Sequence, residues 1–391
     1  MTAELPAATV QPLRLLIVVP SLKRAGAETQ AVELANGLVK SGQAVWLFTF
    51  ELETSLKIRL DERVQFISVP RVHKYDFAPI RALARVLAES SIDVVHSVMQ
   101  FSGLVAWMAI RLSKKSPKLV IAIHTTEPKG IKEWLQDNLV YRFVFKRADQ
   151  VLFVCKAQQK YWGQRFPSLK DNSTYIYNGI NHDLQSDASS ERHAVLRRNA
   201  LGISADDFVF CCVAGLRPEK GHHLLLKAFS KIQQKAFLII AGDGPLRDSL
   251  LAEAERLGIF NKVRFLGEVE GVSQVFCASD IMVLPSLAVE TFSLALLESM
   301  SNGVPVIASR LGGAAEAICD GVDGFICPPR DLSELARLME SVVKERTNLK
   351  KMGSLAREKV RNQFTHTKMV AEHLELFTEL RTSGQRKQIS T

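Results

Sequence analysis

Short apolar runs alternate with helical patterns along most of the chain, and this alternation constrains the fold more than any other feature. The first run, LRLLIVVP at residues 13–20, is continuously apolar, as in a parallel strand covered by helices on both faces. In the next segment, residues 28–40, Leu34, Leu38 and Val39 lie at helical spacing. Strands that alternate with helices in this way predict a doubly wound α/β sheet.

The apolar runs form two series, separated by a polar segment at residues 183–190 (DLQSDASS) that we interpret as a linker. A chain of 391 residues is long enough for roughly 2 to 3 domains. We therefore predict two doubly wound, Rossmann-like α/β domains, residues 1–185 and 186–364, that face each other across a cleft. Residues 365–391 are predicted to form a helix that packs back toward the N-terminal domain, followed from residue 383 by a disordered tail. The strand-like runs lie at 13–20, 44–50, 64–69, 93–98, 119–124, 150–155 and 174–177, then at 208–214, 236–241, 262–266, 280–284, 304–308 and 324–327.

The positive charge of the chain is confined to its first half. Residues 1–180 hold 24 Lys and Arg against 15 Asp and Glu, whereas residues 181–391 hold 26 of each kind. This asymmetry indicates an anionic partner, either phospholipid, a phosphorylated acceptor or nucleic acid, unless the charge only keeps the protein in solution. No recognised nucleic-acid motif is present, so we expect no nucleic-acid partner.

Basic and aromatic residues interleave at 129–147 and 156–170 in this same half. Such segments can lie on an anionic membrane surface, or can be core helices whose basic side chains extend to solvent. The six cysteines form no CxxC pair and indicate free buried thiols in a reducing compartment. The first residues do not resemble a secretory leader, and no apolar run is long enough to span a membrane. We expect a cytoplasmic protein that can contact the cytoplasmic face of a membrane.

The segment from 280 to 303 contains the strongest functional signal. A buried strand ends at Pro285 and Ser286, a loop follows, and a helix is predicted over about 293–300. The backbone N–H groups that open this helix lack intrahelical acceptors, and together with the helix dipole they suit a pyrophosphate. Glu290 precedes the helix and Glu298 lies inside it, where their carboxylates could accept hydrogen bonds from sugar hydroxyls. The alternative is a capping acid and a solvated glutamate. The predicted N–H donors belong to Thr291, Phe292, Ser293 and Leu294.

This block resembles the motif of two glutamates separated by seven residues in retaining glycosyltransferases of family 4, which have the two-domain GT-B fold. Further motifs follow the order of that family and extend the resemblance over most of the chain. It implies a hexosyltransferase that moves a sugar from a nucleotide-sugar to a glycan or lipid-linked acceptor, in cell-surface polysaccharide or glycolipid synthesis. These motifs are AGAE at 25–28, LRPEKG at 216–221, AGDGP at 241–245, FLG at 265–267 and GVPVIAS at 303–309.

The resemblance also implies roles for single residues. Lys220 would bind the donor diphosphate and stabilise the departing nucleotide. Glu290 would contact the donor sugar, and Glu298 would hold the nucleotide ribose. His124, at the end of the strand predicted over 119–124, would contact the donor sugar in the cleft.

Two glycines and one acceptor-side loop complete the predicted site. Gly242 and Gly244 would let a loop approach the ligand without Cβ atoms. The loop Gly26, Ala27 and Glu28 would lie on the acceptor side, with Ala25 in place of a family glycine. Lys23 and Arg24 beside it favour an anionic acceptor.

The chain departs from the family pattern at Gly215, where an arginine normally pairs with the lysine. Arg217, two residues further on, is the candidate replacement. No DxD triad that could hold a catalytic metal is present, so we expect neither a metal nor another cofactor. The sequence leaves two alternatives open, a hydrolysing nucleotide-sugar epimerase of similar fold and a non-catalytic nucleotide-binding partner subunit.

Overall fold

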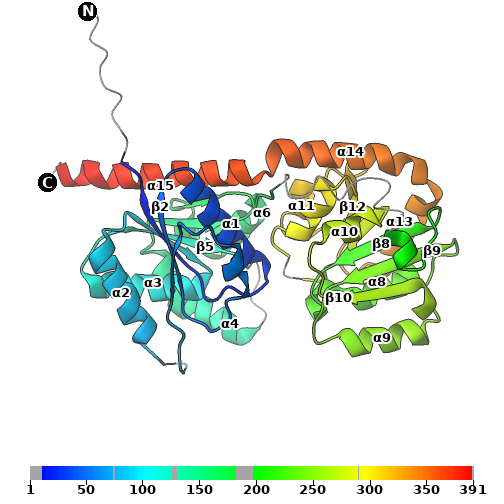
Figure 1. Ribbon diagram of the computed structural model, residues 1–391, viewed down its shortest axis with the longest axis horizontal. Coiled ribbons are helices and arrows are strands. Elements are labelled where there is room, and N and C mark those ends of the chain that lie inside the picture. The colour runs from blue at the N-terminus through cyan, green and yellow to red at the C-terminus, as the bar shows by residue number, and fades with distance from the viewer. Residues whose placement is uncertain (1–10, 74, 126–129, 182–196, 289, 390–391) are drawn as a thin grey trace, which may run out of the picture.

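The computed structural model describes residues 11–73, 75–125, 130–181, 197–288 and 290–389 (Figure 1). The predicted linker at 183–190 and the predicted domain boundary at 185–186 lie outside these residues, as do the first ten residues and Lys129. No helix in the described part of the chain is both long enough and apolar enough to cross a bilayer.

The N-terminal half contains a parallel sheet of seven strands in the order β3-β2-β1-β4-β5-β6-β7. The seven predicted runs all form strands of this sheet, which confirms the predicted α/β architecture. The strands are β1 (Arg14–Val18), β2 (Ala44–Thr49), β3 (Gln65–Ser68), β4 (Val94–Val98), β5 (Lys118–Ile123), β6 (Gln150–Phe153) and β7 (Ser173–Tyr175). The main helices around it are α1 (Gly26–Lys40), α2 (Ala78–Ser90), α3 (Gln100–Ser113) and α6 (Lys156–Arg165).

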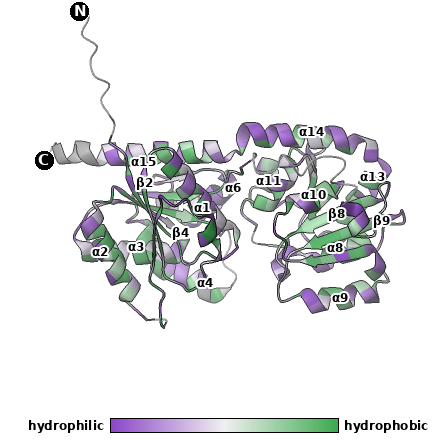
Figure 2. Cartoon of the chain, viewed as in Figure 1, coloured by the Kyte–Doolittle hydropathy of each residue, from purple (hydrophilic) through white to green (hydrophobic). Residues whose placement is uncertain are grey.

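The C-terminal half contains a second parallel sheet, with six strands in the order β10-β9-β8-β11-β12-β13. Figure 2 shows that the strands are mainly hydrophobic, whereas α9 and α14 carry hydrophilic outer faces. The strands are β8 (Phe208–Val213), β9 (Ala236–Ala241), β10 (Val263–Gly267), β11 (Ile281–Leu284), β12 (Val306–Ser309) and β13 (Gly324–Cys327). The helices used below are α8 (His222–Phe229), α9 (Arg247–Arg256), α11 (Leu294–Ser301), α12 (Ala314–Ala317), α13 (Leu332–Lys344) and α14 (Arg346–Gln363).

The continuous apolar character of the central strands follows from burial on both faces. Leu15 and Ile17 of β1 belong to one hydrophobic cluster, whereas Leu16 and Val18 belong to the cluster on the opposite face. Successive side chains of a strand point to opposite faces, so a strand with a core on each side must be apolar at every position.

Each sheet has a topological switch point, where connections leave a central strand in opposite directions. It lies between β1 and β4 in the first sheet and between β8 and β11 in the second. Ligands of open α/β sheets bind beyond the carboxyl ends of the strands at such points. The loops that follow β1, β4, β8 and β11 are therefore placed to form a binding site.

The chain ends on the N-terminal half. After α14, which lies along the C-terminal half, residues 364–366 pair with Ile180 through two backbone hydrogen bonds of 3.0 and 2.9 Å. Helix α15 (His366–Ile389) then runs along the N-terminal half (Figure 1), where Met369, Val370 and Phe377 are buried in the cluster that includes α1. The tail predicted from residue 383 is instead helical to Ile389, because good helix formers extend a helix that packing has already nucleated.

Candidate functional site

Two loops at the switch point of the second sheet bring together the residues of the LRPEKG motif and those near Glu290. Strands β8 and β11 are parallel neighbours, with Ile281 opposite Phe210 and Met282 opposite Cys211. Their carboxyl ends therefore lie side by side, although the loops are some 70 positions apart in sequence. The Leu287 N–H donates to the Glu219 carbonyl at 2.8 Å and joins the two loops.

Gly221 permits this close approach. Its φ is +73°, and a Cβ atom at this position would lie 2.0 Å from the Pro285 carbonyl oxygen. Only glycine combines the left-handed conformation with the absence of a side chain on that face. The conformation of Gly221 ends the short helical turn Pro218–Lys220, so Lys220 is held against the loop that carries Glu290.

Lys220 and Glu290 form a partly buried ion pair, with 2.8 Å between Nζ and Oε2. The side chain of Lys220 is 23% exposed and that of Glu290 is 9% exposed. The Ser286 hydroxyl donates to the same carboxylate oxygen at 2.7 Å. Two residues that were assigned separate roles from sequence are therefore direct partners, and Ser286 is a positioning residue that the sequence reasoning did not identify.

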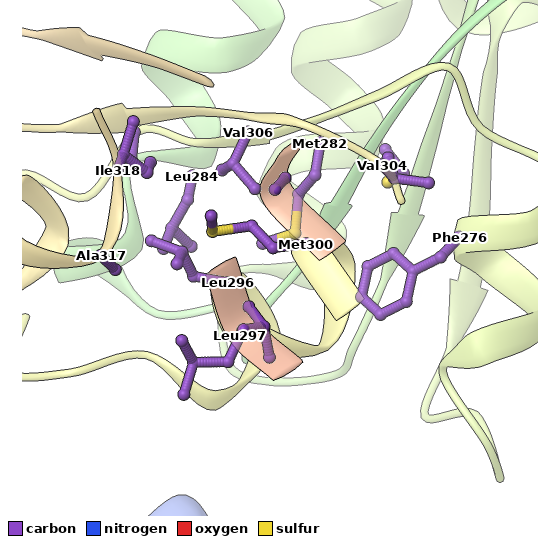
Figure 3. Packing of buried hydrophobic residues seen from close by; sticks show 14 of the residues in the cluster. Phe276, Met282, Leu284, Leu296, Leu297, Met300, Val304, Val306, Ala317 and Ile318 are labelled. Atoms are coloured by element: carbon purple, nitrogen blue, oxygen red, sulfur yellow. The ribbon is translucent and has the colours of Figure 1, made fainter. Parts of the chain in front are cut away.

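Helix α11 begins immediately after this pair. Its first residue is Leu294, and the Ser293 hydroxyl caps it by accepting from the Leu296 N–H at 3.4 Å. Figure 3 shows Leu296, Leu297 and Met300 of this helix packed against Met282 and Leu284 of β11 and Val306 of β12. The apolar contacts fix the direction of the helix, and thus the position of its positive N-terminal end.

The residues that precede α11 contribute backbone rather than side chains. Phe292 is buried and packs on Tyr177 and Phe364, with ring centroids 5.1 and 5.3 Å away. The carbonyl of Thr291 accepts from the Gly313 N–H at 2.6 Å. The side chain of Phe292 is thus part of the core, so this residue can offer a ligand only its main-chain groups.

Glu298 lies one turn inside α11 and is partly buried. Burial raises the pKa of its carboxyl to about 7, and the nearby positive charge of Arg59 opposes this shift. Arg59 belongs to the N-terminal half, where it also pairs with Glu33. A carboxylate that lacks a close counter-charge suits hydrogen bonds from a diol. The sequence analysis did not select Arg59, because nothing in its own segment distinguishes it.

The guanidinium of Arg217 lies close to Gly215, the position at which the family pattern has an arginine. A Cβ atom at Gly215 would lie 3.7 Å from Arg217 Nε. Arg217 is exposed, and its guanidinium has no hydrogen-bond or ion-pair partner among the residues that the structure describes. Its side chain therefore lies over the space that the missing side chain would occupy.

Gly242 and Gly244 allow a close approach between two stretches of backbone. A Cβ atom would lie 2.1 Å from the Ala214 carbonyl oxygen at Gly242 and 2.6 Å from the Leu216 carbonyl oxygen at Gly244. A side chain at either position would therefore collide with the backbone of the loop after β8, and the predicted approach of this loop to a ligand stays a prediction. These glycines help to shape the loop that carries Arg217 and Lys220.

His124 directly follows β5 and lies in a cluster of three histidines. It lines a small cavity of about 30 Å³ together with His96 of β4, His373 of α15 and Asn178. The rings of His96 and His373 pack edge to face at 5.5 Å. Burial lowers the pKa of His124 and of His373 to about 4, so both rings are neutral at pH 7. The contacts that the structure gives for His124 are with N-terminal and α15 residues.

The acceptor-side loop opens α1 and faces α11. A Cβ atom at Gly26 would lie 3.8 Å from Leu294 Cδ1, so the N-terminal ends of the two helices meet here. Glu28 is 1% exposed, its Oε1 accepts no hydrogen bond, and burial raises its pKa. Lys23 Nζ is 3.7 Å from this oxygen. Ala27 packs on the core under α1.

Both cations beside this loop already face acids. Lys23 faces Glu28, and Arg24 reaches across to Glu270 at 3.3 Å and Glu268 at 3.8 Å, after β10. An anionic acceptor would therefore compete with these carboxylates, which the sequence analysis did not foresee.

Further contacts between the halves involve residues that the sequence analysis did not select. Asn178 donates to the Phe292 carbonyl at 3.0 Å. Glu316 of α12 accepts from the N–H groups of Lys156 and Ala157 and from the Tyr177 hydroxyl, at 2.7–3.0 Å. The contacts place the carboxyl edges of the two sheets opposite each other. A glutamate shortly after the glycine pair 312–313 is too weak a signal to have been found.

The cysteines differ in their exposure to solvent. All six cysteines are free, but Cys319 is exposed and Cys277 is partly exposed, so the expectation of burial is wrong for these two.

Across 11–389, apart from the gaps given above, no cluster of three His, Cys, Asp or Glu side chains could hold a metal ion.

Two family models match the chain. The model described as Glycosyltransferase Family 4 matches residues 24–184, and the model described as Glycosyl transferases group 1 matches residues 196–359. The first match covers β2 to β7 and the second covers β8 to β13, and together they span most of the chain.

Several curated proteins are similar over most of their length. An N-acetyl-alpha-D-glucosaminyl L-malate synthase of Bacillus anthracis is 27% identical over 91% of this chain and 94% of its own. An uncharacterised glycosyltransferase of Methanocaldococcus jannaschii is 30% identical over 80% of this chain and 83% of its own. An Escherichia coli UDP-Gal:alpha-D-GlcNAc-diphosphoundecaprenol alpha-1,3-galactosyltransferase is 25% identical over 82% and 85%.

Solved structures show the same arrangement of the two sheets. Anabaena HepE in complex with UDP-glucose superposes with a TM-score of 0.81 and 25% identity, over 93% of this chain and 99% of HepE. A match over both halves at this score establishes the same two-domain architecture, the GT-B fold.

Proposed function

Because this chain belongs to glycosyltransferase family 4, we propose that it transfers a hexosyl group from a UDP-sugar to a hydroxyl of a lipid-linked or glycan acceptor. The enzymes of this family have the GT-B fold, retain the anomeric configuration, need no metal and use nucleotide-sugar donors. The reaction would belong to cell-surface polysaccharide or glycolipid synthesis. The E. coli galactosyltransferase and the HepE–UDP-glucose complex support this choice of acceptor and donor. Membership of this family sets aside the epimerase and the non-catalytic alternatives.

The observation that carries the proposal is the Lys220–Glu290 pair beside the N-terminal end of α11. An ammonium group and unpaired N–H groups at one switch point suit two linked phosphates. Glu290 holds Lys220 in place before the donor binds, so little reorganisation is needed when negative charge develops.

The remaining predicted residues take places around this centre. Glu290 is assigned to the donor sugar and Glu298 to the ribose diol. The exposed guanidinium of Arg217 supplies a second positive charge for the diphosphate, in place of the arginine absent at Gly215. His124, neutral at pH 7, is assigned to a sugar hydroxyl as hydrogen-bond donor or acceptor.

In the proposed step the acceptor hydroxyl attacks the anomeric carbon on the face from which the diphosphate departs. The new glycosidic C–O bond forms as the bond from the anomeric carbon to the phosphate oxygen breaks. The hydroxyl proton passes to the departing phosphate, and Lys220, Arg217 and the α11 N–H groups stabilise its charge. The configuration at the anomeric carbon is retained.

The acceptor is assigned to the N-terminal half, at the loop Gly26, Ala27 and Glu28 that faces α11. The Oε1 of Glu28 makes no hydrogen bond, although Lys23 Nζ lies 3.7 Å away, and it can accept a hydrogen bond from an acceptor hydroxyl. The positive charge of this half favours an anionic acceptor or an anionic membrane. We propose a cytoplasmic location with peripheral contact to the inner membrane face.

A thermal-shift screen across nucleotides and nucleotide-sugars tests the donor assignment, because a ligand of the folded state raises Tm. We expect UDP and UDP-sugars to raise Tm more than the adenine and guanine equivalents. Incubation of the best donor with and without candidate acceptors, followed by product analysis, tests the transfer. Absence of any stabilising nucleotide would contradict the proposal.

A further inference from the structure

The segment after His124 leaves an unusual number of large apolar side chains in water. It comprises α4 (Ile131–Gln136), a π-helical turn (Asp137–Tyr141) and α5 (Arg142–Phe145), which follow one another without a break. Of the fifteen large hydrophobic residues that are exposed in the described chain, twelve lie before residue 181 and six lie in this segment. The six, with their exposed fractions, are Ile131 80%, Trp134 50%, Leu135 43%, Leu139 73%, Val140 39% and Phe143 43%.

The helical geometry gathers these side chains along one side. Ile131, Leu135, Leu139 and Phe143 recur at every fourth residue. In a regular α-helix, residues four positions apart are rotated by about 40° from each other around the helix axis. The π-helical turn at 137–141 has more residues per turn, which reduces this rotation. The four side chains therefore stay close to one line. An apolar line in solvent has no role in the fold and indicates a partner.

A basic groove adjoins this apolar line. It has a volume of about 800 Å³ and is formed where the end of α3 and the loop to β5 meet α5. Phe143 is shared by both features, because its ring packs edge to face on Trp107 at 5.4 Å and lies under the guanidinium of Arg147. The groove is lined by five cations, Arg111, Lys114, Lys115, Lys118 and Arg147, and by one acid, Asp149, which pairs with Lys118 at 2.9 Å.

We infer that the α4–π–α5 segment and this groove form a docking surface for an anionic phospholipid bilayer. The exposed aliphatic side chains would enter the boundary between headgroups and acyl chains, while the four cations other than Lys118 contact lipid phosphates. A nucleic acid would use the cations but would leave Ile131 and Leu139 in an unfavourable polar interface. All the surplus positive charge of the chain lies in this half, and positive charge is attracted to an anionic surface.

The position of the surface suits a lipid-linked acceptor, and this part of the inference rests on the proposed function. Helix α4 lies on the opposite side of the N-terminal half from α15 (Figure 1). Helix α4 follows β5 on the carboxyl side of the sheet, which is the side of the candidate site, whereas the groove lies by the amino ends of β5 and β6. A membrane-bound acceptor could keep its lipid chains in the bilayer while its headgroup reaches α1 and α11.

Flotation of the full chain with vesicles tests the surface. We expect it to float with vesicles of phosphatidylcholine and phosphatidylglycerol at low salt, and to be released at about 1 M salt, where the Debye length is about 3 Å. Trp134 fluorescence should shift to the blue on binding, and Trp134→Phe should reduce the shift, since Trp46 and Trp162 are already buried and only the partly buried Trp107 of the groove could still respond. Equal binding to pure phosphatidylcholine, or no flotation at all, would overturn the inference.

Matched variants locate the surface on the molecule. Lys114→Glu with Lys115→Glu should lower the partition coefficient at least about tenfold, whereas Lys350→Glu with Lys351→Glu, an exposed pair on α14, should leave it unchanged. Ile131→Ser with Leu139→Ser should lower it by about tenfold, in contrast to the exposed control pair Phe260→Ser with Val322→Ser. An equal effect of either control pair would overturn the assignment.

A separate measurement keeps this test independent of the donor site. UDP-glucose affinity should be the same for the wild type and all four paired variants, because none of the substituted residues contacts the candidate site. Loss of flotation in the two variants of the docking surface, with UDP-glucose binding unchanged, confirms the surface. Absence of UDP-glucose binding in the wild type would contradict the proposed function and leave the flotation result valid. Tighter binding of a labelled oligonucleotide than of anionic vesicles would assign the groove to nucleic acid instead.

Discussion

The two switch points of this protein hold their polar groups in opposite ways. Beyond β8 and β11, Lys220, Glu290 and Ser286 satisfy one another, and their contacts are 2.7–2.8 Å long. Beyond β1, the Oε1 of Glu28 and the hydroxyl of Ser21 are buried, and neither makes a hydrogen bond. A buried polar group without a partner costs about 1–3 kcal/mol, so the second arrangement is stable only where other interactions compensate.

This difference indicates how the work is divided between the halves. A preformed ion pair suits the donor diphosphate, which is the same charged group in every nucleotide-diphosphate sugar. The unpaired groups beside α1 suit a hydroxyl that arrives with the acceptor. The substitutions and pH changes below test this difference between the halves, starting with the largest expected effect.

Removal of the ammonium group should have the largest effect. Lys220→Ala should lower kcat about 10²–10³-fold, because the departing diphosphate loses its main counter-charge. Lys227→Ala, which removes an exposed lysine of α8, should be close to wild type. Steady-state kinetics with UDP-glucose measure both. Near-normal turnover of Lys220→Ala would remove this residue from the mechanism.

The packing of the two donor loops should be nearly as sensitive. Gly221→Ala should lower the free energy of unfolding by about 3 kcal/mol or more, because the new Cβ must displace the Pro285 carbonyl. Gly258→Ala is the matched control, since Gly258 has a similar φ of +68° but no atom within 4 Å of the added Cβ. It should lose only about 1 kcal/mol from backbone strain. Urea unfolding compares the two, and equal losses would show that the close approach does not matter.

The carboxyl of Glu298 predicts a pH-dependent donor affinity. Its pKa of about 7 means that it is mainly protonated at pH 6 and mainly ionised at pH 8. If the ribose diol donates to the carboxylate, UDP-glucose should bind about tenfold more tightly at pH 8 than at pH 6. Calorimetry with UDP-glucose avoids the titration of the terminal phosphate of UDP. In Glu298→Gln the affinity should be weaker and independent of pH over this range.

The acceptor side should respond without any change in donor binding. Glu28→Gln should raise the KM for the acceptor about fivefold, since one hydrogen bond to a charged acceptor is weakened. The Kd for UDP-glucose should not change. The variant should also be more stable than the wild type at neutral pH, because burial raises the pKa of Glu28 and its ionised form is disfavoured. A change in donor Kd would contradict the division between the halves.

The histidine cluster should give the smallest effect, a loss of stability in acid. The pKa of His124 and of His373 is about 4 in the folded protein and that of His96 is also lowered, all through burial. The unfolded chain therefore binds more protons, and stability should fall as the pH falls from about 6.5 to 4.

Substitution within the cluster checks this sign. His96→Phe keeps a ring beside His373 and Phe377 and should reduce the loss, whereas His73→Gln, at an exposed histidine, should not. Unfolding curves at pH 4.5 and 7 measure the difference. An unchanged loss in His96→Phe would show that His96 does not contribute to the acid sensitivity.

The α/β architecture followed from the sequence because central parallel strands must be apolar at every position. LRLLIVVP and FVFCCVA are such strands, and their number and order predicted two doubly wound sheets. The motif LRPEKG and the glutamate pair marked the donor side. The roles of the lysine and the two glutamates came from the family resemblance, and ligands of open α/β sheets bind at the carboxyl ends of strands, where these residues lie.

The partnerships between distant residues were decided only by the tertiary structure. The contact of Lys220 with Glu290 depends on the neighbouring positions of β8 and β11, and the burial of the Phe292 ring depends on Tyr177 and Phe364. The glycines at 242 and 244 face backbone, which no local pattern distinguishes from a ligand. The sequence of one segment determines which faces must be buried, but which segment covers each face depends on strand order and on the long-range packing of the chain.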